Sequence, residues 1–189
     1  NILTVGVIHK GIAFPVFWKM LDKRGNSNTE ERIELIKKVI DFLGIENIAG
    51  LLADREFIGK KWFQFLRNQK LHFVIRVKEN FTIPSAKKKN IKQLIQGQPE
   101  GCPIVLKNPY IVCGVSLFVS GMKVQGNQLI VVSDQAMAEP IKYYLKRWEI
   151  ETLFACLKSR GFNFEETHLN KIERIDKLMA LLTIVFCWV

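Results

Sequence analysis

Four side chains near the C-terminal end of the chain have types and spacing that could hold a metal ion beside a phosphate backbone. They are Tyr144, Arg147, Glu151 and Lys158. On one continuous helix, at 100° per residue, they would share a stripe about 60° wide. A carboxylate flanked by an arginine, a lysine and a tyrosine suits a divalent cation together with a phosphate. The pattern is equally compatible with an ordinary solvated face, because Arg147 and Glu151 also form a common i,i+4 surface pair.

A second carboxylate, Asp54, follows the continuous apolar run 48–53, which is typical of a buried central strand. In open α/β sheets, ligands bind at the carboxyl ends of the strands. A half-buried Asp is costly unless it is paired or bound to a metal. Asp54 could instead form the following turn or pair with an arginine.

If Asp54 and Glu151 came together, they could share two Mg²⁺ (or Mn²⁺) ions that activate a water or hydroxyl and stabilise the leaving oxygen. Arg147 and Lys158 would then neutralise nearby phosphates. Tyr144 could donate to a phosphate oxygen or pack on a sugar. The pattern is thus compatible with metal-dependent chemistry on a nucleic acid.

The elements that must position these groups alternate between strand and helix patterns. Runs 2–8 and 12–18 predict a hairpin, and Asn28 or Thr29 can cap a helix that ends at Gly44. The remaining expected elements are a strand at 48–53, a helix at 59–68, a strand at 72–77, strand-like runs at 110–119 and 128–132, a helix at 139–160 and a last helix from 171 or 174. This order predicts a mixed α/β sheet with helices packed on it. The core face of the helix at 139–160 is expected to carry Ile150, Leu153, Phe154 and Leu157.

Composition favours a soluble domain with an acidic partner. The net charge of +10 and the pI near 9.5 point first to nucleic acid and second to an anionic membrane surface. The four cysteines lack metal-ligand spacing and are expected to be reduced thiols of a cytosolic protein. The apolar stretch 178–189 is shorter than the roughly 20 residues that cross a bilayer, which favours a core helix. Both ends of the chain suggest a fragment of a longer protein.

At these residues the chain resembles the bacterial insertion-sequence transposases of the DDE class, in the family numbered four. Its signature Y-(2)-R-(3)-E-(6)-K is complete at Tyr144, Arg147, Glu151 and Lys158. The segment 52–57 (LADREF) is similar to the motif around the second catalytic Asp, and the turn at 21–29 is similar to the approach to the first helix.

The resemblance implies a ribonuclease H-like fold with a β-rich insertion. It predicts a first part of the core at 1–77, an insertion at 78–135 and C-terminal core helices at 136–189. It also implies that Asp54 and Glu151 are catalytic metal ligands for Mg²⁺ or Mn²⁺. Tyr144, Arg147 and Lys158 would bind the DNA.

The expected activity is cleavage of double-stranded DNA at the ends of a mobile element and transfer of the freed 3′-hydroxyls to target DNA. A homodimer in the nucleoid of the bacterial cytoplasm, without a membrane anchor, is expected. The first catalytic Asp of the family would lie on a strand upstream of Asn1, so the fragment alone is expected to be inactive. A decayed remnant that only binds DNA and a nuclease on the same fold are the alternatives.

Overall fold

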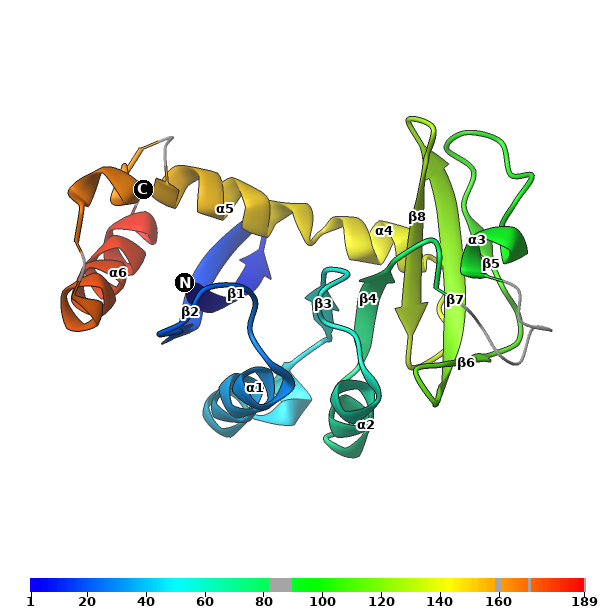
Figure 1. The fold of residues 1–189 in the computed structure, drawn as a ribbon, viewed down its shortest axis with the longest axis horizontal. Helices are drawn as coiled ribbons and strands as arrows, with labels where there is room; N and C mark the ends of the chain where they lie inside the picture. Colours follow the sequence, from blue (N-terminus) through cyan, green and yellow to red (C-terminus); the bar gives the residue numbers. More distant parts are fainter. Residues whose placement is uncertain (82–89, 159–160, 170, 189) are drawn as a thin grey trace. The chain divides into compact units, whose positions relative to one another are not determined.

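The computed structural model describes residues 1–81, 90–158, 161–169 and 171–188, and it forms two compact units (Figure 1). One unit contains Asn1–Val39 and Lys146–Val189, and the other contains Ile40–Leu145. The prediction of a mixed α/β fold with a mixed sheet flanked by helices is confirmed, and it agrees with a ribonuclease H-like class. Among the described residues, no helix has both the length and the apolar character needed to cross a membrane.

The first unit begins with the predicted hairpin. Strand β1 (Ile2–His9) pairs antiparallel with β2 (Ile12–Met20). The two residues between the strands, Lys10 and Gly11, have φ angles of 49° and 81°. Two successive positive φ angles are the geometry of the tight turns that match the twist of paired strands.

Helix α1 (Thr29–Leu43) starts where its capping signal predicts. The Asn28 side-chain oxygen accepts a hydrogen bond from the Glu31 backbone N–H at 2.8 Å, and Glu31 Oε2 accepts one from the Asn28 N–H at 2.7 Å. This reciprocal pair satisfies two N–H groups that lack partners inside the helix. The chain leaves the helix at Gly44, whose φ of 77° suits a residue without a side chain, and continues into the short helix η1 (Ile45–Asn47).

Three further helices complete the first unit: α5 (Trp148–Lys158), η3 (Phe164–Thr167) and α6 (Ile172–Phe186). Helices α5 and α6 both pack on β2. The buried centre of this packing consists of Ala13, Leu153, Leu157 and Met179. At its edge, Trp18 Nε1 donates a hydrogen bond to Asp176 Oδ1 at 2.7 Å, which ties the hairpin to α6.

The second unit is built on a sheet with the strand order β3-β4-β8-β7-β5, and β6 pairs with β7. The strands are β3 (Leu51–Ala53), β4 (Phe73–Val77), β5 (Ile104–Val105), β6 (Tyr110–Val112), β7 (Val115–Val124) and β8 (Asn127–Ser133). The pair β3–β4 is parallel and the other pairs are antiparallel. The short helix α3 (Ile91–Leu94) lies between β4 and β5 in the chain.

Strand β8, from the segment expected to form an insertion, pairs directly with β4 of the expected core. The boundaries of the two compact units also fall at 39/40 and 145/146 rather than at 77/78 and 135/136. The division into core and insertion therefore stays a prediction from the resemblance.

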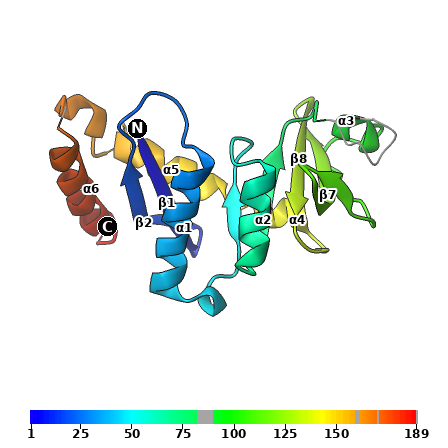
Figure 2. The ribbon, with the colours of Figure 1, turned by 60° about the horizontal axis from the view of Figure 1, so that its bottom comes forward.

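Helices cover both faces of this second sheet (Figure 2). On one face, the Phe63 ring of α2 (Lys60–Asn68) stacks on Phe73 with ring centroids 5.5 Å apart. On the other, Tyr144 of α4 (Pro140–Leu145) packs with Val74 and Val131. Successive strand residues point to opposite faces, so Phe73 and Val74 direct α2 and α4 to opposite sides. This explains why β4 is buried on both faces.

The single helix expected at 139–160 is wrong. Residues Lys146 and Arg147 form a turn between α4 and α5. Across this junction, hydrogen bonds join Ile150 N–H to the Arg147 carbonyl at 3.1 Å and Glu149 N–H to the Lys146 carbonyl at 3.3 Å. Such i→i−3 bonds tighten the backbone and interrupt the α-helical ladder. The two helices pack on different cores, and this packing overrides the helical propensity of the junction.

Two expected strands also differ. The run 48–53 forms a strand only at Leu51–Ala53, and within the described chain this strand pairs with β4 alone, so it is not a central strand. Gly50 precedes it at a close approach, where an added Cβ would lie 3.2 Å from the His72 carbonyl oxygen. The run 110–119 is two strands, because Cys113 and Gly114 adopt φ angles of 49° and 73° and turn the chain.

Candidate functional site

Helix α5 turns its apolar side inward and presents Glu151 on its exposed side. Leu153 and Leu157 are buried in the first unit, and Ile150 and Phe154 pack against them, as the periodicity predicts. Glu151 and Lys158 are both exposed. They are seven residues apart, which places them on the same side of the helix. The packing of α5 thus fixes the direction in which its acidic and basic groups project.

Arg147 immediately precedes α5 and forms an ion pair with Glu151. Its Nη2 atom donates to Glu151 Oε1 at 2.5 Å, and the side chains are 13% and 44% exposed, respectively. This is the i,i+4 pair that the spacing allows. The carboxylate is therefore held by a guanidinium while nearly half of it faces solvent. The structure brings Arg147, Glu151 and Lys158 to one face of one unit.

Tyr144 does not share this face. It lies in α4, in the other unit, and it is only 3% exposed. Its ring packs with Ile141 of the same helix and with Val74 and Val131 of the sheet. The predicted stripe of four side chains required one unbroken helix. The turn between α4 and α5 interrupts that helix, so Tyr144 is not part of the stripe. Three of the four signature residues are grouped by the structure, and the fourth belongs to a core.

Asp54 occupies the position directly after β3 and organises the turn that follows. Its Oδ1 atom accepts a hydrogen bond from the Arg55 N–H at 2.7 Å, and its carbonyl accepts one from Phe57 N–H at 2.9 Å. The side chain is half-buried. The turn-forming role considered for Asp54 is therefore observed, and this role uses only one carboxylate oxygen.

A second acidic residue of the sheet, Asp134, was missed by the sequence reasoning and has a structural role. Its Oδ1 atom accepts from the Phe73 N–H at 2.9 Å, and its Oδ2 atom lies 2.8 Å from His72 Nδ1. Both carboxylate oxygens are engaged in joining the ends of β4 and β8. No local pattern signals this role, because the partners are about sixty residues away in the chain.

The donor chemistry of Asp54 and Glu151 fits a hard divalent cation, which prefers carboxylate oxygens. Asp54 lies in the second compact unit and Glu151 in the first. In the described part of the chain, no three His, Cys, Asp or Glu side chains gather as a metal-binding group. The ligand type is therefore present, and the described residues of each unit contain no complete ligand set.

Comparison of the sequence with known proteins identifies its family. No curated protein matches this chain. A family model described as "Transposase DDE domain" matches residues 16–188, a range that includes the end of β2, Asp54 and α5. Because this match covers nearly the entire sequence, the chain belongs to the family of transposase DDE domains, the catalytic cores of DNA transposases.

Proposed function

We propose that this chain is the catalytic core of a cut-and-paste insertion-sequence transposase of the family numbered four. It would cleave double-stranded DNA at the ends of its element and transfer the freed 3′-hydroxyls to target DNA in the bacterial nucleoid. The observation that carries the proposal is the family match over residues 16–188, together with Glu151 and Lys158 on one side of α5 and Arg147, just before α5, paired with Glu151. The net charge of +10 supports DNA as the partner.

Asp54 and Glu151 would each supply a carboxylate ligand to Mg²⁺ or Mn²⁺. Such ions, when bound in pairs, activate the attacking water or hydroxyl and stabilise the leaving oxygen. Arg147 has a second task besides neutralising phosphates, because its ion pair holds the Glu151 side chain in one direction. Lys158, on the same side of α5, would neutralise a phosphate of the element's end.

Tyr144 would act differently from the other signature residues. Its burial in the second unit favours a role in positioning α4, and through it the start of α5, over direct contact with a phosphate. A direct contact would require the hydroxyl to leave the core.

The class needs a third carboxylate, which we place on a further core strand outside this sequence. Asp22 follows β2 of the two-stranded hairpin and Asp41 lies within α1, whereas Asp54 follows a strand of the larger sheet. The chain alone would then be inactive in cleavage, and 1–77 and 136–189 would form a core completed by that strand, with 78–135 as the insertion. A homodimer follows from the need to join two ends in one complex.

The proposal is tested in the protein as its gene encodes it, with Asp54→Asn and Glu151→Gln. The substrate is a labelled duplex that ends in the element's terminal sequence, with Mg²⁺ and a target plasmid. Both variants should lose cleavage and strand transfer by at least about 100-fold, since even loss of a group that merely orients a metal ligand costs 10–100-fold. Binding of the duplex should be retained.

Glu149→Gln is the matched control, because it removes the same charge from the same helix two residues away. It should leave cleavage intact. Cleavage by either Asp54→Asn or Glu151→Gln would refute the assignment. Binding without cutting by the unsubstituted protein would instead identify a DNA-binding remnant, and hydrolysis without strand transfer would identify a nuclease.

A further inference from the structure

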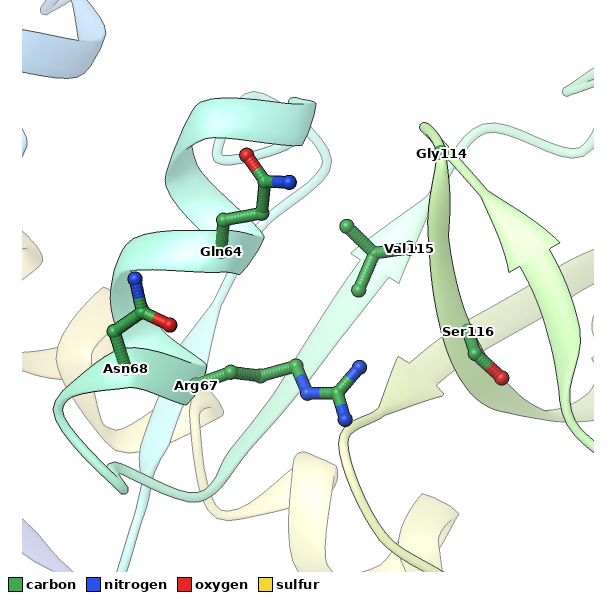
Figure 3. Close-up of a pocket in the computed structure, with 6 residues that line it drawn as sticks. All are labelled: Gln64, Arg67, Asn68, Gly114, Val115 and Ser116. Atoms are coloured by element: carbon green, nitrogen blue, oxygen red, sulfur yellow. The ribbon is translucent and has the colours of Figure 1, made fainter.

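A polar pocket lies in the second unit, between α2 and the turn that joins β6 to β7 (Figure 3). Its volume is about 380 Å³. Arg67 reaches from α2 toward the strand that carries Val115 and Ser116. The lining residues are Gln64, Arg67, Asn68, Gly114, Val115 and Ser116. None of them belongs to the residues proposed above to bind metal or DNA.

The helix side of the pocket is entirely polar. Gln64, Arg67 and Asn68 are spaced i, i+3 and i+4, so they share one face of α2. Trp62, Phe63 and Leu66 occupy the buried face, which fixes the polar face outward. The two amides provide hydrogen-bond donors beside the guanidinium, and the described lining residues include no carboxylate. The Ser116 side chain points away from α2 (Figure 3). Within the described residues, no ion pair involves Arg67.

A second cation lies beside the pocket because Gly114 has no side chain. A Cβ at Gly114 would lie 3.3 Å from Lys60 Cδ and 3.6 Å from Lys60 Cε. The aliphatic stem of Lys60 therefore rests against the turn. Lys60 precedes Arg67 by seven residues, so both cations project from the same side of α2. The turn and the helix face form one basic surface.

We propose that this pocket, whose lining includes neither Asp54 nor Glu151, binds a backbone phosphate of double-stranded DNA. The proposal rests on the proposed function for its choice of ligand. Arg67 would pair with the phosphate through its planar fork, Lys60 would add a point charge, and the amides of Gln64 and Asn68 would donate to the remaining oxygens. Contacts of this kind position a protein on the duplex without reading its sequence.

The test compares two variants that remove the same charge from exposed arginines: Arg67→Gln in the pocket and Arg24→Gln in the turn after β2. The unsubstituted 189-residue chain and both variants are titrated onto a fluorescein-labelled duplex of mixed sequence, by anisotropy, over a series of KCl concentrations. Arg67→Gln should weaken binding about tenfold, the low end for a hydrogen bond to a charged group. It should also reduce the slope of log K against log[salt] by about 1.

Arg24→Gln should change neither the affinity by more than about twofold nor the slope, because only a cation in contact with a phosphate displaces a counterion. Gln64→Ala is a second variant in the same pocket. It should lower the affinity without changing the slope, since it removes a donor and no charge. Circular dichroism of each variant confirms that its fold is intact.

Equal losses of DNA affinity for Arg67→Gln and Arg24→Gln would overturn the proposal, because the loss would then reflect the lower net charge of the protein and not a contact in the pocket. Failure of the unsubstituted chain to bind DNA at low salt would overturn it as well. The proposal would also be overturned if inorganic phosphate raised the melting temperature of the unsubstituted chain but not of Arg67→Gln, while both bound DNA equally well. The pocket would then be a site for a free anion. The assay needs neither metal nor cleavage, so its outcome is independent of the test with Asp54→Asn and Glu151→Gln.

Discussion

Replacing Leu153 with alanine tests the packing that directs Glu151 outward. Leu153 is 1% exposed and lies in the core formed with Ala13, Leu157 and Met179. Leu-to-Ala changes in cores cost about 2.7–5 kcal/mol, and more where the surroundings cannot relax. The partly buried neighbours of Leu153 on α5 can close part of the cavity, so we expect about 3 kcal/mol. This is roughly a 150-fold change in the unfolding equilibrium, a large share of a typical domain's 5–15 kcal/mol.

The assay is urea denaturation followed by tryptophan fluorescence. Trp18 reports on this unit, because it is hydrogen-bonded to Asp176 across the same packing. Thr152→Ala is the control: Thr152 is exposed and adjacent, so its replacement should change the stability by no more than about 0.5 kcal/mol. A loss below about 1 kcal/mol for Leu153→Ala would refute the reasoning. Helix α5 would then present a different face to the hairpin, and Glu151 would not point as described.

Three further outcomes are expected. Asn28→Ala should cost about 1 kcal/mol in urea denaturation, because it removes the cap of α1, and Asn28→Ser should restore most of it. The pKa of Glu31 is lowered, chiefly by its hydrogen bond with Lys23 and then by that with the Asn28 backbone. The ionised Glu31 therefore stabilises the fold above the ordinary glutamate pKa of 4.5, and this stabilisation is lost as the pH falls through the lowered pKa. Lys23→Gln should reduce this loss of stability at acidic pH. Burial raises the pKa of the Cys113 thiol, so at pH 8 it should react with iodoacetamide more slowly than the exposed Cys102, as measured by mass spectrometry of peptides.

Elements with local signals were predicted well. The hairpin follows from two β-rich runs around a short turn, and α1 follows from a capping residue, Asn28 or Thr29, before an apolar-periodic run. Such features depend on residues within one or two turns of each other, so their spacing is visible in the sequence. The apolar face of α5 also follows from its periodicity, and this fixed the exposed side of Glu151.

Pairings between distant segments were not predictable in this way. Nothing between Tyr144 and Trp148 breaks a helix by propensity, yet the chain turns at Lys146 and Arg147 because α4 and α5 pack on separate cores. Likewise, β8 joins β4 through contacts made more than fifty residues apart, which no local pattern encodes. The polar pocket around Arg67 forms because the turn at Gly114 lies against α2. These segments are far apart in the chain, so the spacing of residues in the sequence does not predict the pocket.

The basic charge, the spacing of Arg147, Glu151 and Lys158 and the position of Asp54 after an apolar run are properties of the amino-acid order alone. They are compatible with chemistry on nucleic acid, and the resemblance to DDE transposases narrows this to DNA. Whether each side chain is accessible is a different matter, because exposure depends on which other segments cover it. Tyr144 and Glu151 lie within the same predicted helix, yet Tyr144 is in a sheet-packed core and Glu151 faces solvent. Burial is a sum over non-local contacts, and only the tertiary structure determines that sum.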